Sequence, residues 1–121
     1  MTEGAKALVA FLNSIGTTPA YQEPVSTQAK LPYISFGYIQ GGFSESYIQQ
    51  LTIWTQSESS YQEAYEIADK IAEAVPIQGT LYKTDTATLY IKRGSPFMQN
   101  QRDETPTIRA VLVNLEITQY F

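Results

Sequence analysis

The feature that most constrains the fold is a strict alternation of side-chain character over residues 108–120. Its odd-numbered positions are apolar from 111 to 117, whereas polar residues occupy most of the even-numbered ones. Successive side chains of a β-strand point to opposite faces, so a period of two predicts a strand with one buried face. We therefore expect a core-facing row that consists of Val111, Val113, Leu115 and Ile117.

Two other segments show the helical period of three to four residues. The first lies near the N-terminus and should end at Gly16, and its apolar stripe is Ala5, Leu8, Val9, Leu12 and Ile15. In the second, Ser60 and Glu63 have the spacing of a capping box, and Pro76 should end the helix. The core-facing residues of this second helix should be Tyr61, Ala64, Tyr65, Ala68, Ile71, Ala72 and Val75.

A β-hairpin is expected between the two helices. Residues 33–39 alternate between apolar and small side chains, and glycines within 40–44 supply a turn before a return strand over 47–55. Residues 17–31 have no sustained period and should form an extended connection that pairs only briefly. The return strand should place Tyr47, Leu51 and Ile53 on one face, and Ile48 and Trp54 on the other.

After the second helix, strands over 81–83 and 88–93 should flank a tight connection, and an irregular strand should follow over 97–103. The expected fold class is α+β: a two-layer sandwich in which two helices cover one face of a mainly antiparallel sheet of four to five strands. The length of 121 residues predicts a single domain, 1–121. The aromatic candidates for the uncovered face are Tyr47, Trp54, Tyr82 and Tyr90.

Residues 93–107 are predicted to form a flexible hairpin arm. This segment contains one glycine and two prolines, and its Phe97 and Met98 stand among polar residues. It is either a mobile hairpin tip or an arm that orders against a partner, with the two apolar side chains as anchors. Basic residues gather around it, and we expect them to form salt bridges within or between subunits rather than a DNA-contacting groove: Lys92, Arg93, Arg102 and Arg109.

The chain has no cysteine and no histidine. Disulfides, thiolate nucleophiles, Cys/His zinc sites and iron–sulfur or haem ligation are therefore excluded, and the commonest proton-transfer group is missing. Asp85 with Asp103 or Glu104 could be a carboxylate pair for glycoside hydrolysis, but acidic residues are ordinary in the turns predicted there. Glu63, Glu66, Asp69 and Glu73 should form a solvated helix face. We predict no enzymatic activity, no cofactor and no metal site.

The charge and composition limit the partners. The net charge of -4 and pI of about 4.7 argue against a broad basic surface for nucleic acid, and no apolar run approaches the roughly 20 residues that span a bilayer. The N-terminus lacks the basic stretch of a signal peptide. Charged residues make up 17% of the chain, which also has nine tyrosines. That composition suits contact with other proteins, or it is only a preference in solvent-facing residues.

Three stretches together resemble the small tail-terminator and tail-completion proteins of long-tailed bacteriophages. They are LPYISF at 31–36, QLTIWT at 50–55 and YQEAYEIADKI at 61–71. Members of that family have an N-terminal helix, a P-Y-I strand, a strand ending near I-x-W and a helix of the A-x-x-I-A-D-x-I kind. A closing strand follows an arginine, here Arg109. The resemblance covers about residues 31–118.

This resemblance implies an α+β subunit of a homohexameric ring that stops polymerisation of the tail tube at its head-proximal end and joins the tail to the head connector. It implies contacts with itself, with the tail tube protein and with connector or neck proteins. DNA would pass through the pore without sequence-specific binding. The protein would lie in the virion tail, and in the host cytoplasm during assembly.

Matching positions do not assign the ring contacts. From the residues alone, the candidates for a subunit or partner interface are Tyr47, Trp54, Tyr82, Tyr90, Arg93, Phe97, Met98, Arg102 and Arg109. The alternatives to a tail terminator are a head-completion or neck protein, and a small ligand-binding α+β module with a pocket between the tyrosine-bearing strands and the second helix.

Overall fold

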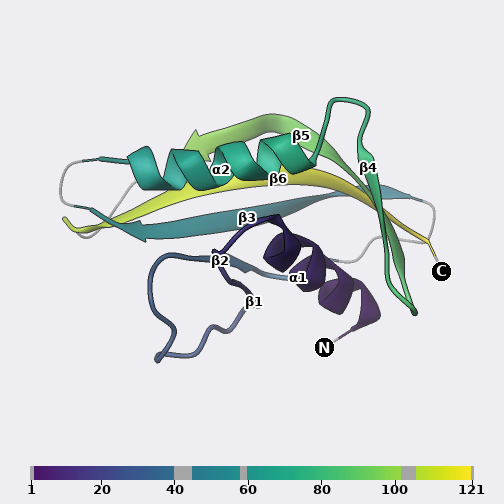
Figure 1. Ribbon diagram of the computed structural model, residues 1–121, viewed down its shortest axis with the longest axis horizontal. Coiled ribbons are helices and arrows are strands. Elements are labelled where there is room, and N and C mark those ends of the chain that lie inside the picture. Colours follow the sequence, from purple (N-terminus) through teal and green to yellow (C-terminus); the bar gives the residue numbers. More distant parts are fainter. Residues whose placement is uncertain (1, 40–44, 58–59, 102–105, 121) are drawn as a thin grey trace.

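Figure 1 shows the computed structural model of the chain, which describes residues 2–39, 45–57, 60–101 and 106–120. These residues form two helices and six strands in one sheet, so the predicted α+β class is confirmed. In chain order the elements are α1 (Glu3–Ile15), β1 (Ala20–Gln22), β2 (Tyr33–Phe36), β3 (Ser46–Gln56), α2 (Gln62–Ala74), β4 (Thr80–Lys83), β5 (Thr88–Asn100) and β6 (Ile108–Tyr120).

The strand order is β1-β2-β3-β6-β5-β4, and the sheet is mixed. The β2–β3, β3–β6, β6–β5 and β5–β4 pairs are antiparallel, whereas β1 runs parallel to β2 with Ala20 opposite Ile34. The expected number of four to five strands is therefore wrong, and the sheet is mixed because of β1, although its other four pairs are antiparallel as expected. The additional strand, β1, lies in the segment 17–31 that was expected to pair only briefly, and its three residues are too few for a period of two to show in the sequence.

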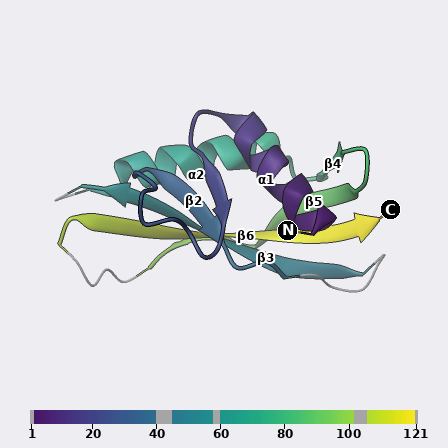
Figure 2. The same cartoon turned by 90° about the horizontal axis from the view of Figure 1, so that it is seen from below.

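Both helices lie on the same side of the sheet (Figure 2). α2 packs on the central strands β3 and β6, whereas α1 contacts β1 at one edge and β4 and β5 at the other. Such contacts require the sheet to curl around α1. They include a hydrogen bond from the Ala20 N–H to Asn13 Oδ1 of 2.9 Å and an edge-to-face contact between Phe11 and Tyr82 with ring centroids 5.4 Å apart.

The alternation in β6 is confirmed as the basis of the core. Its predicted core-facing residues are all buried, and they meet buried residues of α1, α2, β3 and β5 in one cluster. Burial of a leucine or isoleucine side chain contributes about 1.5–3 kcal/mol, so this row is a major source of stability. The other face of the sheet carries no helix, and we call it the helix-free face.

The helix boundaries agree with the sequence except at the start of α2. In α1, the Ala5 N–H donates to Thr2 Oγ1 over 3.2 Å, and the helix ends before Gly16 as predicted. The predicted capping box of Ser60 and Glu63 is wrong, because α2 begins at Gln62 with Tyr61 as its N-cap. Ser60 Oγ instead accepts from the Gln62 N–H over 2.9 Å, a short local turn that competes with capping.

The β2–β3 hairpin pairing is confirmed, with Ile34 opposite Ile53. β2 is shorter than predicted, because the chain leaves the sheet after Phe36. The buried Gln49 side chain forms hydrogen bonds with the backbone that follows β2. It accepts from the Ile39 N–H over 3.2 Å and donates to the Gly37 carbonyl over 3.0 Å. The glycine turn predicted within 40–44 lies outside the described residues.

β5 is longer than predicted, and it contains an irregularity instead of an end. Its register against β6 shifts between Arg93 and Met98. A Cβ on Gly94 would lie 2.9 Å from the Asn114 carbonyl oxygen, so glycine permits this close approach. Residues 93–100, the first part of the predicted arm, thus belong to the sheet, while 102–105 lie outside the described residues.

Candidate interaction surface

Of the nine predicted interface residues, Trp54 and Tyr90 lie on the helix-free face. The strand register places Trp54 opposite Ala110 and Tyr33, and Tyr90 opposite Thr118. These two positions lie toward opposite ends of β6. The Tyr90 hydroxyl donates to the Gln78 carbonyl, which fixes the ring at the β4 side of the sheet.

Tyr47 and Tyr82 were expected on the uncovered face, and this placement is wrong. Tyr47 lies opposite the buried Ile117, Tyr82 packs against Phe11, and both contact the hydrophobic core. The sequence carried a usable signal for Tyr47. It has the same parity in β3 as Leu51 and Ile53, so a period of two puts it on their side of the sheet.

Burial raises the pKa of Tyr47 well above its ordinary value of 10.0, and the neighbouring Tyr38 hydroxyl adds to the rise. The unfolded chain therefore releases this proton at lower pH than the folded protein does. The contribution of this retained proton to the free energy of unfolding is therefore fully present below pH 10.0. It is lost as the pH rises through the pKa of Tyr47 in the folded protein.

We therefore expect the Tm of the protein to fall as the pH is raised above about 10, and to fall less steeply in Tyr47→Phe, which lacks the titrating group. Thermal unfolding followed by circular dichroism over a pH series measures this. Each protein is referenced to its own Tm at neutral pH, where Tyr47 is protonated in both states. Parallel pH curves for the two proteins would contradict the assignment.

Large apolar side chains that the sequence analysis did not select are exposed on the helix-free face. Ile48 is 48% exposed, Leu81 58% and Tyr120 40%. The register places Ile48 opposite Glu116, and Leu81 opposite Tyr90, toward the end of the sheet where β6 finishes. Alternation along the strands could have predicted this face. Ile48 precedes the buried Gln49, and Leu81 precedes the core-facing Tyr82, so both point away from the core. We call Ile48, Leu81 and Tyr120 the apolar patch.

Arg93 lies on the helix side of the sheet, where it binds the C-terminal end of α2. Its Nε donates to the Val75 carbonyl over 2.7 Å, and its Nη2 donates to the Ala72 carbonyl over 2.7 Å. The guanidinium carbon also lies 5.9 Å from the centre of the Phe97 ring, which packs on the core. Arg93 and Phe97 are thus engaged within the subunit.

Arg109 lies near the other end of α2. Its guanidinium carbon is 5.7 Å from the centre of the Tyr61 ring, and its Nη2 donates to the Pro106 carbonyl over 3.0 Å. Met98 is exposed opposite Val113, and Arg102 lies outside the described residues. Lys92 forms an exposed ion pair of 3.9 Å with Glu116. Contacts of these residues with a partner stay a prediction.

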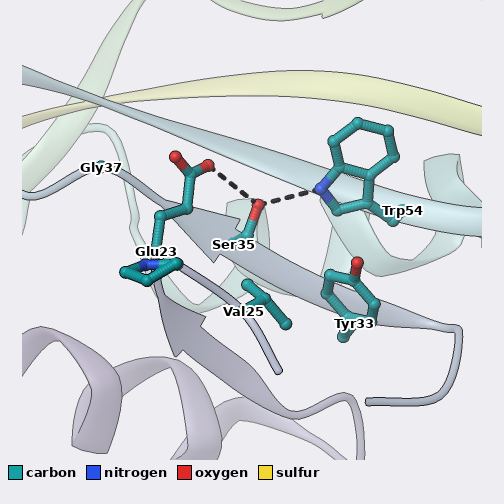
Figure 3. Close-up of a pocket in the computed structure, with 7 residues that line it drawn as sticks. Glu23, Val25, Tyr33, Ser35, Gly37 and Trp54 are labelled. Carbon is teal, nitrogen blue, oxygen red and sulfur yellow. Dashed lines mark hydrogen bonds between the residues drawn. The ribbon is translucent and has the colours of Figure 1, made fainter. Parts of the chain in front are cut away.

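A hollow of about 610 Å³ opens on the helix-free face beside β1, β2 and β3 (Figure 3). Its lining is Glu23, Pro24, Val25, Tyr33, Ser35, Gly37 and Trp54. The Trp54 indole N–H donates to Ser35 Oγ over 2.9 Å, and the Ser35 hydroxyl donates to Glu23 Oε1 over 3.3 Å. Apart from Trp54, the sequence analysis missed these residues, because segments that are not adjacent in the chain bring them together.

A scan against protein-family models matched none of them, and a search of the curated proteins returned no match. Among the residues that the structure describes, no helix is long and apolar enough to cross a membrane.

Proposed function

We propose that this chain is a structural virion assembly protein: a ring-forming tail terminator of a long-tailed bacteriophage. Six copies would close a ring on the head-proximal end of the tail tube, stop its polymerisation and present a surface to the head connector. DNA would pass through the central opening without sequence-specific binding. Such a subunit functions through its shape and through its association with identical subunits.

The apolar patch is the observation that carries self-association. Both helices occupy one face of the sheet, and on the other face Ile48, Leu81 and Tyr120 are each at least 40% exposed. Exposed apolar side chains at one end of a sheet face suit a protein–protein contact, and here the Lys92–Glu116 ion pair lies between Ile48 and Leu81. Contact between different surfaces of identical subunits, repeated with a rotation that closes, generates a ring.

The order of elements supports the choice of family. The expected pattern has an N-terminal helix, a P-Y-I strand, a strand with I-x-W, a helix and a closing strand after an arginine. The chain has α1, β2 with Tyr33 and Ile34, β3 with Ile53 and Trp54, then α2, and finally β6, in which Arg109 is the second residue and precedes the alternating run from Val111. A head-completion or neck protein shares this chemistry and differs in its location in the particle.

The other alternative, a ligand-binding module with a pocket between the strands and the second helix, has less support. A hollow of about 480 Å³ lies between α1 and α2 with no strand residue in its lining, and a hollow between α1, α2 and β2 has a volume of about 10 Å³. That is room for about one water molecule, far below the several hundred Å³ of a small-molecule site.

Leu81→Asp tests the proposal, because a carboxylate in a subunit contact would have to be desolvated. In negative-stain electron microscopy, the wild-type protein should form rings with a central opening, and Leu81→Asp should give particles of single-subunit size. Ile77→Asp is the matched control, since Ile77 is 84% exposed and precedes β4 outside the sheet.

The control variant should form rings like the wild-type protein, and circular dichroism should show both variants folded. Rings that persist in Leu81→Asp would exclude the apolar patch as the contact. An absence of rings in the wild-type protein at every concentration would contradict the proposed function itself.

A further inference from the structure

The hollow beside β1, β2 and β3 combines a carboxylate with aromatic rings. Glu23 stands exposed at its rim, and Tyr33 and Trp54 are half-buried in its wall. Figure 3 shows the Glu23 carboxylate and the Trp54 indole on either side of the Ser35 hydroxyl. A second tyrosine, Tyr21, contacts Tyr33 edge to face with ring centroids 5.7 Å apart.

Hydrogen bonds hold the two functional groups of the hollow in position. Ser35 is buried, with 2% of its surface exposed, and its hydroxyl both accepts from Trp54 and donates to Glu23. The indole N–H and one carboxylate oxygen therefore share one buried hydroxyl before any ligand arrives. Such preorganisation lowers the entropic cost of binding.

The charge of Glu23 is not neutralised within the subunit as far as the structure describes it. The ion pairs among the described residues join Lys6 to Glu3 and Lys92 to Glu116, and neither includes Glu23. The second carboxylate oxygen lies on the Gly37 side of the hollow, 3.7 Å from where a Cβ on Gly37 would stand. An anion beside electron-rich ring faces attracts a cation.

We propose that this hollow binds the guanidinium group of an arginine side chain from a partner protein. A guanidinium is planar and stacks on aromatic faces, and its N–H groups match a carboxylate, whereas an ammonium offers a point charge. The hollow opens widely on the sheet surface, so the backbone of the partner segment can remain outside. This inference does not depend on the ring proposal.

The capped amino acid N-acetyl-arginine N-methylamide is the probe, and Trp54 is the reporter because it is the single tryptophan of the chain. Titration should change the indole fluorescence saturably, and the affinity should fall as salt is added. The matching citrulline derivative, neutral and nearly the same shape, should bind at least tenfold more weakly. Equal responses to the two probes would overturn the proposal.

Glu23→Gln keeps an acceptor for the Ser35 hydroxyl and removes the charge. It should weaken binding of the arginine probe about tenfold, whereas Glu73→Gln, on the exposed side of α2, should leave the affinity unchanged. Unchanged affinity in Glu23→Gln would overturn the site. Tighter binding of free arginine than of the capped probe would overturn its assignment to a protein side chain.

Discussion

Leu115→Ala is expected to lower the free energy of unfolding by about 2–5 kcal/mol, the range for truncating a buried leucine. Leu115 is fully buried in β6, opposite Gln49 on β3 and Arg93 on β5. Truncation there leaves a cavity between the sheet and the helices, and paired strands on both sides limit collapse around it. Urea unfolding followed by circular dichroism measures the change.

The matched control for this prediction is Leu112→Ala in the same strand. Leu112 has the opposite parity and is partly exposed on the helix-free face, so its truncation should cost no more than about 1 kcal/mol. The same change is thus made twice, three residues apart, on the two faces of β6. Equal losses in the two variants would contradict the account of the core.

Arg93→Ala is expected to lower the free energy of unfolding by about 1.5–3 kcal/mol, the range for hydrogen bonds to a charged group. The last turn of α2 contains no basic residue, so Arg93 supplies from β5 the positive charge that favours a helix C-terminus. Its loss leaves the Ala72 and Val75 carbonyls without these donors. Urea unfolding gives the magnitude.

Two further variants separate the causes of that loss. Arg93→Lys keeps the charge but not the fork of N–H groups, so it should recover only part of the stability. Lys92→Ala, on the neighbouring residue, removes only an exposed 3.9 Å ion pair and should cost less than about 1 kcal/mol. A loss in Arg93→Ala no larger than in Lys92→Ala would show that the bonds to α2 contribute little.

The parts of the fold that the sequence predicted are those with local periodicity. β6 follows its alternation over residues 108–120, and α1 follows its apolar stripe up to Gly16. In each case the pattern and the structure depend on neighbours a few residues away. The face of Tyr47 also follows from local periodicity, because Tyr47 has the same parity in β3 as the buried Leu51 and Ile53.

The parts that were missed depend on pairing between distant segments. β1 is a strand because it pairs in parallel with β2, with Ala20 opposite Ile34, and nothing within its three residues indicates this pairing. The hollow needs Glu23, which directly follows β1, beside Ser35 of β2 and Trp54 of β3, and strand order and register decide this juxtaposition. Neither order nor register can be read from a single short strand.

The mass of the wild-type protein in solution, measured by light scattering after size exclusion, tests the central claim of ring assembly most directly. The account predicts a single species of about six times the 13.5 kDa of one chain, persisting on dilution. A species of 13.5 kDa at every concentration tested would contradict it.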